Sequence, residues 1–144
     1  MNKKAELFNQ LLEEGPENVF NIQEAEDELH SVIYHSKLNV NGKDYFFIVV
    51  FDDTDTTVVN LLLDEENVTS ENYGYVVDFC NTQNRSTRVM RFYVDTEDRV
   101  MLDCCLTARE EFFDPAAVAT LIDAMAEAVS VSEEALQKAL RCEE

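Results

Sequence analysis

The sequence predicts an α+β fold in which an antiparallel sheet of about five to six strands is flanked by helices. Strand-length segments, either alternating or continuously apolar, follow one another with short turns between them, as in hairpin-linked strands. Segments with apolar residues at helical spacing stand before, between and after these strands. The expected order is α-β-β-β-β-α-β-β-α-α, and we expect residues 1–144 to form a single domain.

The first helix is predicted from Phe8, Leu11 and Leu12, which follow helical spacing. Gly15-Pro16 is typical of a helix end, because glycine accepts the left-handed conformation there and proline cannot continue the helix. A short strand is expected over 19–22.

The next three strands form a predicted meander. Residues 31–40 alternate between apolar and polar, and Asn41-Gly42 is the strongest short hairpin signal, since both turn residues must accept positive φ. Residues 45–51 are continuously apolar, which predicts a central strand covered on both faces. An acidic turn over 52–55 separates it from a strand over 58–63.

A helix is predicted over 70–83, with Thr69 or Ser70 as its N-cap, because apolar residues recur there at i, i+3, i+4 and i+7. Two strands follow, over about 87–94 and 99–107. Asp114-Pro115 then begins a helix that reaches Val129, and Ser132 begins a last short helix.

The composition is strongly acidic, with 30 Asp and Glu against 11 Lys and Arg, for a formal net charge of −19. Such a surface repels nucleic acid and anionic membranes, whose binding requires cationic side chains, and it favours basic partners, cations or simply solubility. No stretch approaches the roughly 18 apolar residues of a transmembrane helix. The four cysteines show no regular spacing, so we expect free thiols and a cytoplasmic protein.

No motif predicts catalysis, a cofactor or a metal, so we expect a protein that is not an enzyme. Cys104 and Cys105 are neighbours on a strand and point to opposite faces, which leaves one in the core and the other less buried; a redox role stays open. His30 and His35 are likewise expected on opposite faces of an extended segment. The acidic turn with Asp52, Asp53 and Asp55 lacks the EF-hand glycine, so weak cation binding there stays open.

The second half of the chain resembles the YbjN-like family of bacterial proteins. The resemblance rests on a helix ending in Asn84-Arg85, the strand Val89-Met90-Arg91-Phe92-Tyr93-Val94-Asp95, an acidic turn, the strand Val100-Met101-Leu102-Asp103, and a helix with an early proline. It implies a fold similar to type III secretion chaperones, in a bacterial cytoplasmic protein linked to regulation or stress. It implies no catalytic residues.

Three functional hypotheses remain. The first is a non-catalytic protein-binding or regulatory module, chaperone-like or an adaptor, which binds a basic or partly unfolded protein through a sheet face or helix groove. The second is an acidic inhibitor or immunity-type protein that blocks a basic enzyme. The third is an unrecognised enzyme or metal-binding protein, and a homodimer is open in each case.

The candidate partner contacts are an aromatic pair before the long C-terminal helical region and two leucines near its end. Either the aromatic pair staples the following helix, which we favour, or it marks an exposed contact patch. These residues are Phe112, Phe113, Leu136 and Leu140.

Overall fold

The computed structural model describes residues 1–14 and 20–143, and in them a six-stranded antiparallel sheet is flanked by helices. The strand order is β1-β2-β3-β4-β6-β5, so the fold class expected from the sequence is confirmed. The strands are β1 (Asn21–Glu24), β2 (Val32–Val40), β3 (Lys43–Phe51), β4 (Thr56–Asp64), β5 (Met90–Val94) and β6 (Val100–Thr107). The helices are α1 (Lys3–Glu14), α2 (Tyr73–Ser86), the short 3-10 helix η1 (Glu110–Phe112) and α3 (Pro115–Leu140).

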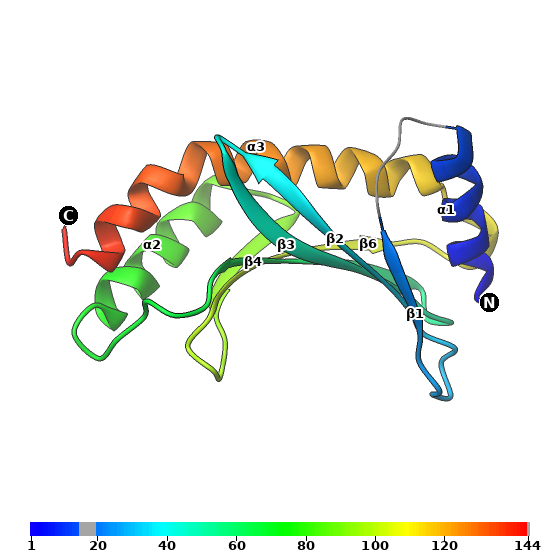
Figure 1. Cartoon of the computed structure of the whole chain (residues 1–144), viewed down its shortest axis with the longest axis horizontal. Coiled ribbons are helices and arrows are strands. Elements are labelled where there is room, and N and C mark those ends of the chain that lie inside the picture. Colours follow the sequence, from blue (N-terminus) through cyan, green and yellow to red (C-terminus); the bar gives the residue numbers. More distant parts are fainter. Residues whose placement is uncertain (15–19, 144) are drawn as a thin grey trace.

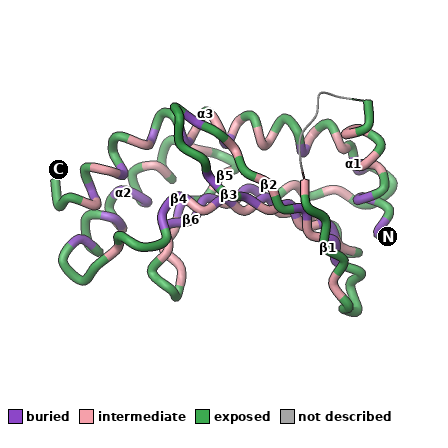
Figure 2. The backbone as a smooth tube through the Cα atoms, viewed as in Figure 1, coloured by how far each residue is buried: buried purple, intermediate pink, exposed green. Residues whose placement is uncertain are grey.

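All three α-helices lie on the same side of the sheet (Figure 1). Helix α3 runs above its length, α1 packs at one end and α2 at the other, and no described segment covers the opposite side. Buried residues therefore follow the strands and the helix surfaces turned toward them (Figure 2). The sheet has one core face and one face left open.

Side-chain alternation assigns each strand residue to one of these faces. Along β2, Val32, Tyr34 and Val40 are buried under the helices, as the alternation predicted. Along β3 the expectation of cover on both faces is wrong: Phe47, Val49 and Phe51 are buried, whereas Phe46 is 64% exposed. Strand β3 is central in its sheet, but all the helices pack on the face that carries Phe47, Val49 and Phe51. The face that carries Phe46 is therefore left without cover.

The C-terminal region forms one continuous helix, α3, where the sequence indicated two. Asp114 is its N-cap, and its carboxylate accepts a hydrogen bond from the backbone N–H of Ala116 (3.0 Å). Ser132 does not begin a new helix, because it is buried inside α3 with its hydroxyl donating to the Val129 carbonyl (3.5 Å).

The continuity of α3 changes one expectation about membranes. The joined helix is long and apolar enough to cross a membrane by length and composition alone, which neither of the two shorter expected helices was. In the structure, Val118, Met125 and Val129 on one side of α3 are buried in the hydrophobic core beneath it.

Helix α2 begins at Tyr73, three residues later than expected, and its N-cap position is Asn72 rather than Thr69 or Ser70. The Asn72 side chain does not cap the helix. It accepts from the N–H of Thr69 (2.7 Å) and donates to the carbonyls of Asn67 (2.8 Å) and Leu140 (3.0 Å). This buried amide therefore ties the loop before α2 to the end of α3, a contact between residues far apart in sequence.

Helix α1 is held by an aromatic cluster and by a buried lysine. Phe8 packs edge-on against Tyr34 (5.3 Å between ring centroids) and in a tilted arrangement against Phe51 (5.2 Å). Lys4 is 1% exposed, and its ammonium donates to the carbonyls of Thr54 (2.8 Å) and Thr56 (3.0 Å). The expected helix end at Gly15-Pro16 and the start of the 19–22 strand lie outside the described residues; β1 itself begins at Asn21.

One edge of the sheet is closed by a side chain. On the outer edge of β5, the Asn84 amide accepts from the Phe92 N–H (2.8 Å) and donates to the Phe92 carbonyl (3.0 Å). Thr87 donates to the Met90 carbonyl on the same strand (3.2 Å). These side chains take the place of a neighbouring strand, which protects the edge from pairing with another chain.

We predict that Lys4→Met destabilises the protein by about 2–4 kcal/mol, since the carbonyls of Thr54 and Thr56 would lose the buried ammonium that donates to both. Lys3→Met is the matched control: Lys3 is exposed, with one distant ion pair to Glu110 (4.0 Å), and its loss should cost less than about 0.5 kcal/mol. Urea unfolding followed by circular dichroism measures both. Equal changes in the two variants would contradict the anchoring role of Lys4.

Candidate functional site

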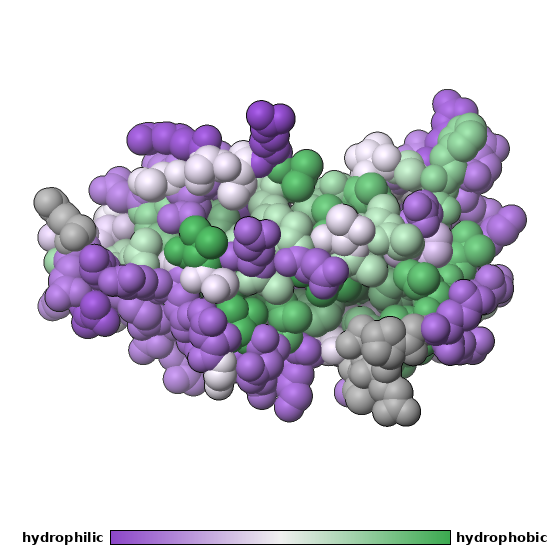
Figure 3. Space-filling view, turned by 90° about the horizontal axis from the view of Figure 1, so that it is seen from above, coloured by the Kyte–Doolittle hydropathy of each residue, from purple (hydrophilic) through white to green (hydrophobic). Residues whose placement is uncertain are grey.

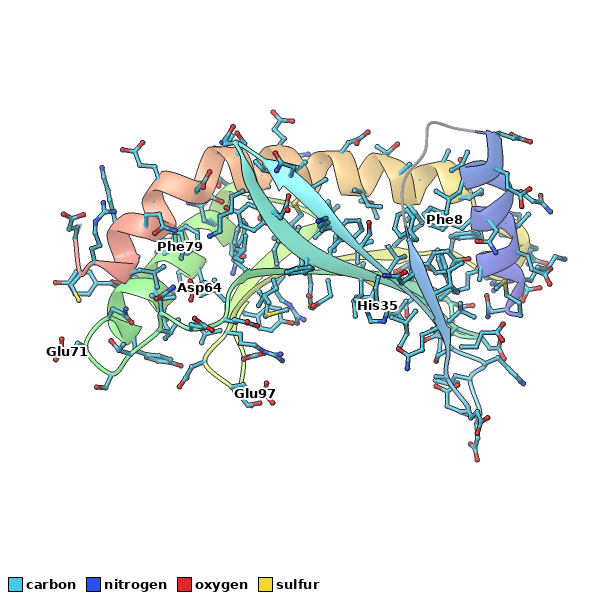
Figure 4. All side chains as sticks on the ribbon, in the orientation of Figure 1. Phe8, His35, Asp64, Glu71, Phe79 and Glu97 are labelled. Atoms are coloured by element: carbon cyan, nitrogen blue, oxygen red, sulfur yellow. The ribbon has the colours of Figure 1, made fainter. Side chains whose placement is uncertain are left out.

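The open face of the sheet is the surface formed by strand side chains that point away from the helices. His35 lies on this lower side in Figure 4, whereas Phe8 and Phe79 lie among the helices above the sheet. The open-face residues used below are Ile33, His35, Lys37, Asp44, Phe46, Ile48, Val50, Val58, Asn60, Leu62, Arg91, Tyr93, Met101, Asp103 and Cys105.

The centre of the open face is apolar. Phe46, Ile48 and Val50 stand on successive outward positions of β3, and the side chains of Ile33 and Val58 flank Val50 in register. A hollow of about 320 Å³ lies beside them, lined by Phe46, Ile48, Leu62, Met101, His35, Asn60 and Arg99 among others. We name the six residues Ile33, Phe46, Ile48, Val50, Val58 and Leu62 the apolar centre.

A polar network borders the apolar centre toward β5. The Asn60 amide donates to the Asp103 carboxylate and to the Tyr93 hydroxyl. Arg91 donates to the other Asp103 oxygen (2.8 Å) and lies over the Tyr93 ring (4.6 Å to its centroid). These groups satisfy one another across three strands, so they form a fixed rim and offer no unpaired group for chemistry.

The four candidate partner contacts do not form one surface. Phe112 is 73% exposed in η1, but Phe113 is buried against Phe51, with ring centroids 5.8 Å apart. Phe113 precedes the N-cap of α3 and shares the core cluster with Val118 four positions into the helix, which is the arrangement of a hydrophobic staple. Leu136 is buried as well, and Leu140 is half-buried against the core. A role of these four residues as partner contacts stays a prediction.

The cysteines divide as expected for neighbours on a strand: Cys104 is buried and Cys105 is exposed on the open face. Burial raises the pKa of the Cys80 thiol to about 11 and also raises the pKa of Cys104. Cys142, just after α3, is exposed. No disulfide joins cysteines in the described residues.

The two histidines lie apart. His35 is on the open face and contacts the Gln23 side chain (3.2 Å). His30 is not on a strand: it sits in the β1–β2 loop with a positive φ of 51°, and its Nδ1 lies 2.5 Å from the Asp53 carboxylate. The extended geometry expected for both is therefore wrong for His30.

Two carboxylates of the acidic turn over 52–55 accept hydrogen bonds from the protein. Asp52 accepts from the Thr54 backbone N–H (2.9 Å), and Asp53 accepts from the Asn2 side chain (2.9 Å). Within residues 1–14 and 20–143, no three His, Cys, Asp or Glu side chains are grouped to hold a metal ion.

The helical side carries two grooves. One of about 610 Å³ lies between α2 and α3 and includes the exposed Tyr75 and Val131. The other, of about 400 Å³, is lined by α1, β2 and α3 and includes Leu11 and Ile122. Seen from this side, apolar residues show between hydrophilic ones (Figure 3).

The sequence suggests a sheet face as a possible contact surface, but it does not identify Phe46 and its neighbours as the residues of that surface. The continuous apolar run 45–51 contains no polar position to mark which side faces water. The alternation in β2 and β4 was the available signal, because Lys37 and Asn60 fall on the same side as Phe46 and Ile48.

The comparisons with known proteins place the chain in no family. No protein-family model matches it, and no curated protein matches its sequence. Among solved structures it is similar to the type III secretion chaperone SycH of Yersinia pestis, solved in complex with a stable fragment of YscM2. The identity is 16%, the match covers 88% of this chain and 98% of that chain, and the TM-score is 0.45. The YbjN-like resemblance remains a prediction.

We predict that a thiol reagent at pH 8 modifies Cys105 and Cys142 in the folded protein at least about tenfold faster than Cys80 and Cys104, because burial both shields the latter and disfavours their thiolates. Mass spectrometry of digested protein measures each site, and modification in urea serves as the control. If Cys105 were protected like Cys104, the open face would be covered.

Proposed function

We propose that this protein is a non-catalytic protein-binding module, chaperone-like or an adaptor, which contacts its partner through the open face of the sheet. The uncovered apolar centre carries the proposal. Contiguous apolar surface of this kind, bounded by polar residues, is typical of protein interaction sites. The polar network beside it resembles the polar rim of such interfaces.

The area of the apolar centre limits the free energy that its burial can contribute to binding. Strand spacing and residue rise give the block of nine outward positions on β2, β3 and β4 about 14 Å by about 17 Å, and the apolar centre fills six of the nine, or roughly 160 Å². Its complete burial would stabilise a complex by about 4 kcal/mol. Association itself costs about 4–15 kcal/mol, so a partner also needs contacts around the apolar centre.

The composition supports the rest of the proposal. A net charge of −19 disfavours nucleic acid and anionic lipid as partners and favours a basic or partly unfolded protein. We propose that this binding occurs in the cytoplasm, in keeping with four cysteines that form no regular pattern.

We predict that Phe46→Asp lowers the recovery of a partner at least about tenfold, because it places a charge in the middle of the contact. Phe112→Asp is the matched control, since Phe112 is at least as exposed as Phe46 but lies outside the open face. Recovery of the partner with this variant should change less than about twofold. Tagged protein purified from its host at low and moderate salt, with mass spectrometry of what accompanies it, measures both.

The register pairs Phe46 with Lys37, so an aspartate at position 46 has a cation beside it and the fold should persist, which circular dichroism checks. Dependence on Phe112 alone would place the contact at η1 and contradict the proposal. If recovery of the partner depended on salt but was unchanged by both phenylalanine substitutions, the result would favour the acidic-inhibitor hypothesis.

A further inference from the structure

Two acidic loop pairs stand at opposite ends of the open face. The first, named here the β1–β2 wall, consists of residues 25–31 and 52–55. The Asp53 backbone N–H donates to the Leu29 carbonyl (2.9 Å), and His30 pairs with the Asp53 carboxylate, so the two loops form one structure. The wall has six carboxylates and no lysine or arginine of its own, and the buried Lys4 ammonium that contacts it at the Thr54 carbonyl leaves a carboxylate surplus.

The second, named the β5–β6 wall, consists of residues 64–67 and 95–99. Glu97 lies at the tip of the β5–β6 turn, well below the sheet (Figure 4). Arg99 pairs with Asp95 (2.8 Å) and Glu97 (3.2 Å), interacts with Glu65, and borders the hollow of the open face. The single arginine leaves this wall with a carboxylate surplus.

The open face between the walls carries no net formal charge. Its two cations are each matched by a carboxylate: Lys37 with Asp44 (3.6 Å) and Arg91 with Asp103 (2.8 Å). In a chain of net charge −19, the acidic surplus thus lies beside the apolar centre and not on it. A bound segment would meet apolar surface in the middle and negative potential at both ends.

Strand β4 gives the separation of the walls, because it begins directly after Asp55 and ends directly before Glu65. Nine residues of strand rise about 30 Å. That distance is covered by about nine residues of extended chain, or by about 20 residues of α-helix. The apolar centre is too small for a second folded domain, since standard interfaces bury about 800 Å² per partner.

A second copy of this chain fits poorly as the occupant. Two open faces packed together would bring carboxylate-rich walls near one another, and like charges across an interface oppose association. A segment with cations at its ends removes that repulsion and matches both walls.

Resting on the proposed function, we infer that the open face binds a single segment of a partner protein, apolar in its middle and carrying lysine or arginine at both ends. The apolar middle covers Phe46 and its neighbours. The basic ends contact the β1–β2 wall and the β5–β6 wall. The walls supply the contacts that the apolar centre alone lacks, and they make the affinity depend on salt.

The test is a selection from a displayed library of random 20-residue peptides on the full chain, with Phe46→Asp used for counter-selection. The expected peptides have an apolar middle and Lys or Arg near both ends. Calorimetry with a synthetic peptide from the selection should show at least about tenfold weaker binding at 300 mM than at 50 mM NaCl.

Charge reversal locates the ends of the segment. Glu26→Lys with Glu28→Lys, and separately Glu65→Lys with Glu97→Lys, should each weaken binding of that peptide at least tenfold. The control pair on α3, Glu127→Lys with Glu134→Lys, makes the same change in net charge and should alter binding less than twofold.

Four results would overturn the inference. Peptides that depend on Phe46 but lack basic ends, or wall reversals as mild as the α3 control, would refute it and leave the proposed function standing. A dimer in sedimentation that Phe46→Asp dissociates would assign the open face to a second copy. If no peptide depended on Phe46, the proposed function would fall with the inference.

Discussion

All three α-helices bury their apolar stripes against one face of the sheet, and the rest of the structure depends on that one-sided packing. The core is built from alternate residues of every long strand together with Phe8, Val76 and Val129 of the helices. Because alternation sends the remaining strand residues to the other side, covering one face leaves the other exposed. The open face is therefore a direct consequence of how the core is made.

The helices are held in place by contacts between distant parts of the chain. Lys4 joins α1 to the turn before β4, and Asn72 joins the loop before α2 to the end of α3. Asn84 joins α2 to β5 and closes that edge of the sheet. Each contact satisfies buried or edge backbone groups that would otherwise need water or another chain.

The same arrangement separates two kinds of surface. Apolar side chains occupy the middle of the open face, where the paired charges of Lys37, Asp44, Arg91 and Asp103 balance. Carboxylates gather in the loops at the strand ends, where solvent reduces the cost of their mutual repulsion. A strongly acidic protein thereby keeps a neutral contact surface, and its loops set the electrostatic preference for what binds there.

The sequence by itself determined the fold class, the meander and the N-cap of α3, because these rest on local signals. The Asn41-Gly42 turn has positive φ at both residues, as the pair requires, and Asp114-Pro115 begins the last helix. Tertiary packing decided what local signals could not. Ser132 is buried inside α3 and does not begin a new helix, and α2 begins at Tyr73, where the Asn72 side chain bridges to the Leu140 carbonyl and does not cap the helix. Tertiary packing also decided the candidate site. All residues from Tyr45 to Phe51 are apolar, so the sequence does not show which alternate set of side chains faces the core. Only the placement of all the helices on one side left Phe46 in solvent.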